Sequence, residues 1–151
     1  MRARRLRPGE GWERVLFDLL TITGWTWVHT KPAFVPGRRA PITAMEGPGA
    51  KGWPDITAHR AGRFLVAEAK SGDASLSPLQ RRRLADIDAG GIVEAYLFHE
   101  RDLETIRSVL QHEVWPPLIA AEARALQPWR YRRSRLDAPS EPGAVRARVR
   151  G

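Results

Sequence analysis

The chain has 151 residues, a mass of 17.0 kDa and a net charge of +8. It has no apolar run of about 18 residues that could span a membrane, and no apolar stretch behind its basic N-terminus to form a signal peptide. The absence of cysteine excludes disulfides and thiolate zinc sites. The four histidines, His29, His59, His99 and His112, lack the spacing of a metal site. These features predict one cytoplasmic domain with tails.

The positive charge is concentrated at the two ends of the chain. Residues 1–8 carry four arginines, and residues 127–151 carry seven arginines and two acids, whereas residues 9–126 have a net charge of about −1. We therefore divide the chain into a basic arm (1–8), a domain (9–126) and an Arg-rich, flexible tail (127–151). Such arms are typical of non-specific nucleic-acid binders. The alternative is codon bias in a GC-rich genome, because the chain has 22 Arg and only 3 Lys.

The first third of the chain predicts a helix, a strand and a long loop. Apolar residues at helical spacing indicate a helix over 10–23, ended by Gly24. Thr26–His29 is rich in Trp and β-branched residues and predicts a short strand. Residues 30–51 are rich in Pro and Gly, and we interpret them as a loop that covers a substrate groove. Its basic residues are predicted phosphate contacts: Lys31, Arg38, Arg39 and Lys51.

Residues 52–70 predict a hairpin whose two strands join at Ala61 and Gly62. If these two residues form the loop, opposite residues have numbers that sum to 123, so Asp55 faces Glu68 with Cβ atoms about 4.5–5.5 Å apart. A turn with Gly only at its second position leaves open a bulge that would shift this register. Lys70 lies two residues beyond Glu68 and shares its face.

Two opposed carboxylates repel each other, and a divalent cation between them removes that cost. Mg²⁺ is a hard ion that is usually held by one or two carboxylates together with waters and substrate phosphates. The ammonium of Lys70 could meet a phosphate or an attacking water. Asp55, Glu68 and Lys70 therefore form a candidate metal and phosphate site at one end of the hairpin.

The next helix, over 77–89, has clear start signals. Ser77 is an N-cap residue, Pro78 stands in the first turn and Gln80 completes a capping box. Arg81 and Arg82 follow near a helix N-terminus, which itself favours anions.

The second half of the chain alternates strands and helices. Gly90 and Gly91 end the helix, a buried strand is predicted over 92–98, and another helix over 102–110. This order implies a parallel, right-handed crossover and a mixed α/β fold.

The end of the chain predicts a helix followed by a segment that has two interpretations. One more helix is predicted over 114–126. After it, aromatic residues alternate with arginines in the segment Trp129, Arg130, Tyr131, Arg132 and Arg133. This segment either stacks on unpaired bases and contacts phosphates or docks as an arm on the core.

The sequence resembles the PD-(D/E)xK nuclease signature, in Pro54-Asp55 followed by Glu68-Ala69-Lys70. It is most similar to the virus-type replication-repair nuclease (VRR-NUC) branch, through Gly52 before Pro54-Asp55, Gln80, and a Gly before the next strand. The resemblance covers roughly residues 11–110. It implies a restriction-endonuclease-like core, with a central mixed β-sheet of about four strands flanked by helices. It also implies a Mg²⁺-dependent DNA endonuclease, with Mn²⁺ as a substitute, that acts on flap, branched or junction DNA in replication, repair or recombination.

The resemblance assigns roles to individual residues. Asp55, Glu68 and the backbone carbonyl of Ala69 would bind the metal, and Gln80 would position water or phosphate. Lys70 would orient or deprotonate a water or steady the transition state. Glu13 of the first helix would complete the metal shell, unless it is a solvated helix residue. A catalytically silent DNA-binding module and an RNA nuclease are the alternative functions, and homodimerisation is left open.

Overall fold

A four-stranded sheet forms the centre of the molecule. The computed structural model describes residues 10–30, 32–33, 36–37, 39, 42–43, 45, 47–112 and 120–130. The sheet has the order β1-β4-β5-β6 and consists of β1 (Thr26–His29), β4 (Ile56–Arg60), β5 (Arg63–Lys70) and β6 (Glu94–His99). β4 is antiparallel to both β1 and β5, and β6 runs parallel to β5.

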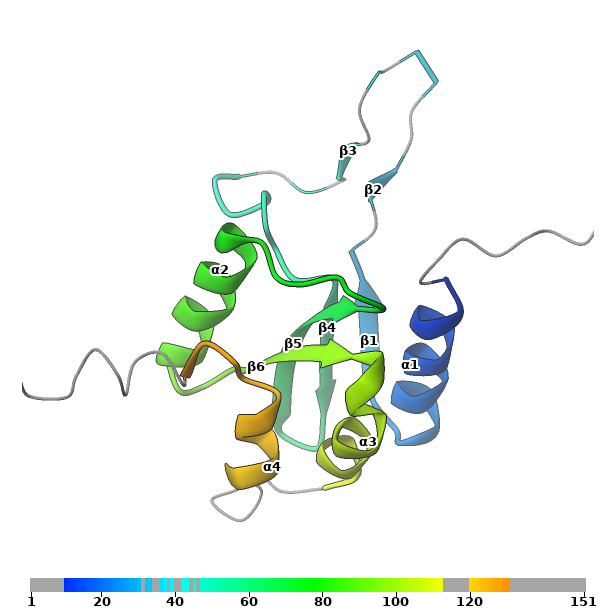
Figure 1. Ribbon diagram of the computed structural model, residues 1–151, viewed down its shortest axis with the longest axis vertical. Helices are drawn as coiled ribbons and strands as arrows, with labels where there is room; N and C mark the ends of the chain where they lie inside the picture. The colour runs from blue at the N-terminus through cyan, green and yellow to red at the C-terminus, as the bar shows by residue number, and fades with distance from the viewer. Residues whose placement is uncertain are drawn as a thin grey trace, which may run out of the picture.

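Helices cover the two faces of the sheet. α1 (Glu10–Ile22) and α3 (Leu103–Gln111) pack on one face. Their side chains Leu16, Leu20 and Ile106 are buried there in one cluster with Ile56 and Leu65 of the sheet. On the other face, α2 (Pro78–Ala89) contributes Leu84 to a second cluster, which contains the side chains Val66, Leu76, Ala95 and Trp129. α1 and α2 stand on opposite sides of the sheet in Figure 1. Side chains alternate between the two faces along β5, since Leu65 and Val66 belong to different clusters.

The turn between β4 and β5 has the geometry that keeps the predicted register. Ala61 and Gly62 both have positive φ, at 45° and 80°, as in the type I′ turns whose twist matches a hairpin. Ile56 is paired with Ala67 and His59 with Phe64, so paired numbers sum to 123 and no bulge intervenes. Ala61 is the only non-glycine residue with positive φ in the described part of the chain. The register that places Asp55 opposite Glu68 is confirmed.

The other predicted elements differ mainly at their ends. The strand β6 begins at Glu94 and not at Ile92, which is 88% exposed. A 3₁₀ turn, η1 (Glu100–Asp102), precedes α3. The predicted loop of residues 30–51 contains a short antiparallel pair, β2 (Pro32–Ala33) and β3 (Ile42–Thr43), which projects beyond the sheet in Figure 1. α4 spans Ala120–Ala125, and the earlier part of the helix predicted over 114–126 lies outside the described residues.

The segment after α4 covers the edge of β6. Leu97 N donates to Leu126 O at 2.8 Å, and Gln127 Nε2 donates to Ala95 O at 3.0 Å. Gln127 is buried. The folded region therefore continues past residue 126, where we predicted that the domain ends.

The sheet is mixed, has four strands and carries helices on both faces, which confirms the predicted α/β fold with a central sheet of about four strands flanked by helices. None of the helices in the described residues is long and apolar enough to cross a bilayer.

Candidate active site

Asp55 and Glu68 meet where β4 begins and β5 ends. Asp55 directly precedes β4, and its Oδ2 accepts a hydrogen bond from Ala69 N at 3.0 Å. The backbone carbonyl of Asp55 accepts a hydrogen bond at 2.7 Å from the N of Thr30, the residue that follows β1. Asp55 is thus anchored to the two neighbouring strands. These bonds place its carboxylate beside Glu68.

Glu68 is a buried carboxylate that lies beside a second acid, Asp55, while Lys70 is the cation paired with it. Its side chain is 2% exposed, and its Oε1 accepts hydrogen bonds from Lys70 Nζ at 2.8 Å and Gln80 Nε2 at 2.5 Å. Burial and the negative charge of Asp55 raise the pKa of Glu68 to about 7, although Lys70 acts in the opposite direction. A pKa near neutrality means that Glu68 holds a proton much more readily than an exposed glutamate does.

Gln80 has two roles at once in the structure. Its backbone N donates to Ser77 Oγ at 3.2 Å, and its Oε1 accepts from Ser77 N at 2.9 Å, which completes the predicted capping box. The amide Nε2 of the same side chain donates to Glu68. The cap therefore fixes the Gln80 side chain in the position from which it contacts the carboxylate. The helix start and the candidate site are one hydrogen-bonded unit.

The backbone at Gly52, three residues before Asp55, has a conformation and a close neighbour that only glycine accommodates. It has a φ of +77°, and a Cβ at this position would lie 2.8 Å from Leu79 Cγ. Any larger residue would therefore press on the first turn of α2, which carries Gln80. The glycine permits the close approach of the two segments that build the site.

The carboxylates of Asp55 and Glu68 fit a divalent cation by their chemistry. Both provide oxygen donors, which hard ions such as Mg²⁺ prefer, and their repulsion is what a cation would relieve. Within the described residues, no group of three or more His, Cys, Asp or Glu side chains is arranged to hold a metal ion. Glu13, which lies half-buried on α1, therefore does not form such a group with these two acids.

The predicted nucleic-acid contacts fall into two sets. In the described part of the chain, Lys51, Arg39 and Arg82 are exposed and Arg81 is half-buried, so their roles stay predictions. The other predicted contacts lie outside the described residues: Lys31, Arg38, Tyr131, Arg132, Arg133 and the basic arm of residues 1–8.

The structure corrects the assignment of Trp129 and Arg130 to base and phosphate contacts. The ring of Trp129 is 8% exposed and packs against Val66, Leu84 and Ala95, and its Nε1 donates to Asp88 Oδ2 at 3.0 Å. Arg130 forms two hydrogen bonds with the same carboxylate, at 2.6 and 2.7 Å. The alternative that this segment docks on the core is therefore confirmed for these two residues. A buried ring offers no surface on which a base can stack.

His99 is a neighbour of the site that the sequence analysis did not identify. It is paired with Lys70 at the parallel ends of β6 and β5, and it is 2% exposed. Its Nδ1 accepts a hydrogen bond from Arg101 N at 3.3 Å, and its Nε2 is buried without a hydrogen-bond partner among the described residues. The signal was the predicted parallel crossover, because parallel strands bring their carboxyl ends to the same edge of a sheet.

No protein-family model and no curated protein matches the chain. Among solved structures, it is similar to Hjc, a Holliday junction resolvase from the archaeal hyperthermophile Archaeoglobus fulgidus. The two are 24% identical with a TM-score of 0.40, and the match covers 62% of this chain and 70% of that one. The assignment to the virus-type replication-repair nuclease branch stays a prediction.

Proposed function

We propose that this protein is a metal-dependent nuclease of the PD-(D/E)xK type that hydrolyses phosphodiester bonds in DNA. The observation that carries the proposal is the pair of opposed carboxylates, Asp55 and Glu68, beside the ammonium of Lys70. Negative charge gathered at one sheet edge attracts a divalent cation. A cation and an ammonium together match a phosphate and the charge that develops on it during hydrolysis.

Each residue of the site has a role in this proposal. Asp55, Glu68 and the backbone carbonyl of Ala69 would hold Mg²⁺ or Mn²⁺, which supplies Lewis acidity and charge neutralisation at the phosphate when bound. Gln80 keeps Glu68 in position through its amide and is itself held by Ser77. Lys70, now paired with Glu68, would turn to the phosphate or to the attacking water once a cation takes its place at the carboxylate.

The destabilisation that two neighbouring buried acids cause favours catalysis over a silent binding module. A buried Glu68 beside Asp55 destabilises the ionised, metal-free protein, as its raised pKa indicates. A protein that only holds DNA could carry glutamine at this position without that cost. The presence of both acids therefore supports a function that needs both charges.

DNA with branches, flaps or junctions is the proposed substrate. The resemblance of Gly52-Trp53-Pro54-Asp55 and Gln80 to the VRR-NUC branch supports DNA in replication, repair or recombination. The arginine-rich ends of the chain supply charge for phosphate contacts that do not depend on sequence. A homodimer would permit paired cuts on a two-fold junction.

The test is cleavage of a panel of labelled substrates by the wild-type protein. The panel contains duplex, splayed, flap, gapped and four-way DNA, with RNA of the same sequences, and each is incubated with Mg²⁺, with Mn²⁺ or with chelator. We expect cleavage of branched DNA with either cation and none in chelator. Binding of the same substrates is measured in chelator.

The outcomes separate the candidate functions. Binding of DNA with no cleavage under any metal would favour the silent binding module over the enzyme. Faster cleavage of RNA than of DNA would favour the RNA nuclease. Equal cleavage of every DNA geometry would contradict the proposed structure specificity but not the proposed nuclease activity.

A further inference from the structure

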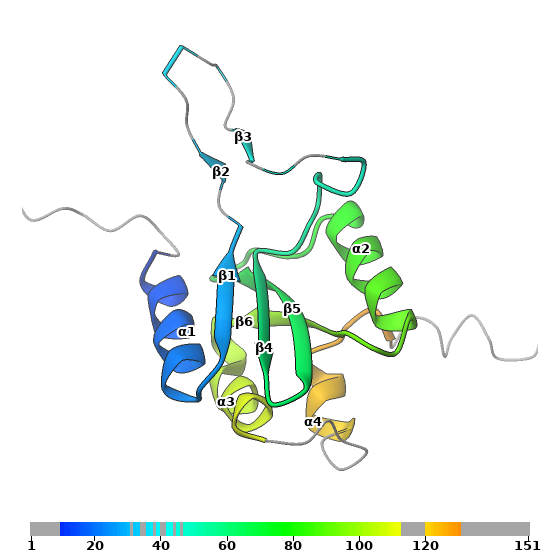
Figure 2. The same ribbon diagram turned by 180° about the vertical axis from the view of Figure 1, so that it is seen from behind.

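One half of the sheet face that carries the site is uncovered. α2 packs against β5 and β6, whereas in Figure 2 it stands beside β5 and not over β1 and β4. The side chains of β1 and β4 on this face are consequently accessible, and Val28 is 65% exposed. Phe64, at the start of β5, is 41% exposed. On the opposite face of the same strands, Ile56 and Ala58 are fully packed.

Five residues form this surface, which we call the open sheet face: Thr26, Val28, Thr57, His59 and Phe64. The pairing of the strands sets them in two rows. Thr26 is paired with His59, which is paired with Phe64, and Val28 is paired with Thr57. Asp55 and Glu68 occupy the next row on the same face, two residues along each strand. Two residues of strand span about 7 Å, so the open sheet face begins about 7 Å from the carboxylates.

The chemistry of the open sheet face differs from that of a duplex-binding surface. None of its five residues is Lys, Arg, Asp or Glu. Proteins hold duplex DNA largely by cationic contacts to phosphates. Proteins that hold single strands add to their cationic phosphate contacts aromatic side chains on which unpaired bases stack. Phe64 and Val28 offer such contacts on either side of β4, and the threonine hydroxyls between them are hydrogen-bond partners for sugars and bases.

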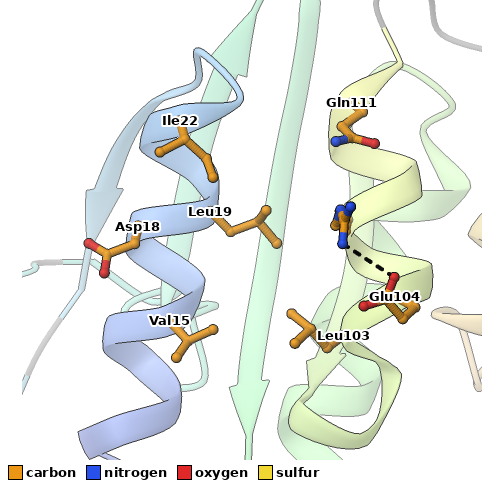
Figure 3. Close-up of a pocket in the computed structure, with 8 residues that line it drawn as sticks. Val15, Asp18, Leu19, Ile22, Leu103, Glu104 and Gln111 are labelled. Carbon is orange, nitrogen blue, oxygen red and sulfur yellow. Dashed lines mark ion pairs between the residues drawn. The ribbon is translucent and has the colours of Figure 1, made fainter.

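A second exposed apolar region lies on the other side of the molecule. A groove of about 370 Å³ runs between α1 and α3, with Val15, Leu19, Ile22 and Leu103 as apolar lining (Figure 3). Asp18 also lines the groove, and Glu104 forms an ion pair there with Arg107 at 3.5 Å. The groove is separated from Asp55 and Glu68 by the sheet, since α1 and α3 pack on the face opposite α2.

We infer that the open sheet face binds a single-stranded stretch of the substrate next to the scissile phosphate. The inference rests on the proposed function, because it takes Asp55 and Glu68 as the place of cleavage. The single strand would run from the carboxylates along β4, between Val28 of β1 and Phe64 of β5, with Phe64 stacked on a base. The preferred substrates are then DNAs with an unpaired arm beside the cut, such as splayed or flap structures, over intact duplex.

The experiment compares variants of the open sheet face with matched variants elsewhere. Phe64→Ala removes the ring, Phe64→Tyr keeps it, and Val28→Asp places a negative charge on the face. Ile92→Ala and Ile92→Asp are the controls, because Ile92 is 88% exposed and precedes β6 at its end remote from Lys70. Binding to an oligo-dT of about 16 nucleotides, to splayed DNA and to blunt duplex is measured by fluorescence anisotropy in chelator.

We expect Phe64→Ala to weaken binding of oligo-dT and splayed DNA by at least about fivefold, which corresponds to one lost base stack. Val28→Asp should weaken the same two probes, while both Ile92 variants and Phe64→Tyr bind as the wild type does. Duplex binding should be unchanged in Phe64→Ala. If Phe64→Ala does not fold, Val28→Asp against Ile92→Asp carries the test.

Three results would overturn the inference. They are unchanged binding in both variants, an equal loss on duplex and single strand, and a change in the mass of the protein in solution caused by Val28→Asp. The last result would assign the face to a second copy of the chain. Because binding is measured without metal, failure here is distinct from failure of the nuclease proposal, which would appear as no cleavage by the wild type.

Discussion

Two buried glutamates on neighbouring strands have opposite surroundings. Glu94 at the start of β6 forms two hydrogen bonds with Arg63, at 2.7 and 2.8 Å, and accepts a third from Tyr96. Glu68 near the end of β5 faces Asp55 and shares one oxygen between Lys70 and Gln80. Both side chains are 2% exposed. The sheet therefore carries a neutralised ion pair at one end and surplus negative charge at the other.

The difference separates a structural ion pair from the proposed metal site. Arg63 is held on every side, since its guanidinium also donates to Val109 O and His112 O and lies over the ring of Trp25. Nothing remains there for a ligand to satisfy. At Glu68, burial and Asp55 raise the pKa to about 7, so the site is stabilised by a proton or by a cation. Surplus buried charge, rather than burial itself, distinguishes the end of the sheet that we propose as the active site.

The largest expected effect comes from neutralising the acids at the functional end. Asp55→Asn and Glu68→Gln should each lower Mg²⁺-dependent cleavage by at least about 100-fold, because the cation loses half of its charged ligands. DNA affinity in chelator should change little. Single-turnover cleavage and binding isotherms on the same preparations measure both. Wild-type cleavage in either variant would contradict the metal assignment.

Removing Glu94 should instead reduce stability. Glu94→Ala leaves the guanidinium of Arg63 buried without its carboxylate, which costs about 3–5 kcal/mol for a buried pair. Urea denaturation at neutral pH measures the free energy of unfolding. Glu68→Gln is the matched control, because it alters the other buried glutamate and should not destabilise the protein. A loss below about 1 kcal/mol for Glu94→Ala would mean that the pair behaves like a surface salt bridge.

Lys70→Arg tests whether the ammonium acts on a water or only attracts phosphate. Arginine keeps the charge but replaces a compact, titratable ammonium with a broad, permanently protonated fork. We expect turnover to fall by about 100-fold, a typical contribution of acid–base catalysis, with affinity unchanged. Turnover close to that of the wild type would make Lys70 a phosphate contact.

The smallest expected effect is a pH dependence of stability in chelator. The pKa of Glu68 is about 7 in the folded protein and about 4.3 in an unfolded chain, so the folded state binds more protons between these values. Stability contributed by this proton is present below about pH 4 and is lost as the pH rises to about 7, by about 1–3 kcal/mol. Glu68→Gln should flatten this fall between about pH 4 and 7. An equal pH slope in the variant would show that other groups cause it.

The sequence by itself determined the elements and the meeting of the two acids. Ser77, Pro78 and Gln80 start α2 by bonds within four residues, and the Ala61–Gly62 turn fixes the hairpin register. These interactions are local, so they can be derived from spacing alone. Because the strand period is two, the register then puts Asp55 opposite Glu68 without further information.

The tertiary structure decided which of the remaining polar and aromatic residues are used up by the fold. Trp129 resembled a base-stacking residue because aromatic and basic neighbours are common to both roles, but it packs against strands and a helix more than 30 residues away. The Arg63–Glu94 pair spans 31 residues, and the contact of Gln80 with Glu68 depends on how α2 lies on the sheet. Such contacts join distant segments. Since their distance in space is set by packing and not by spacing along the chain, only the folded structure reveals them.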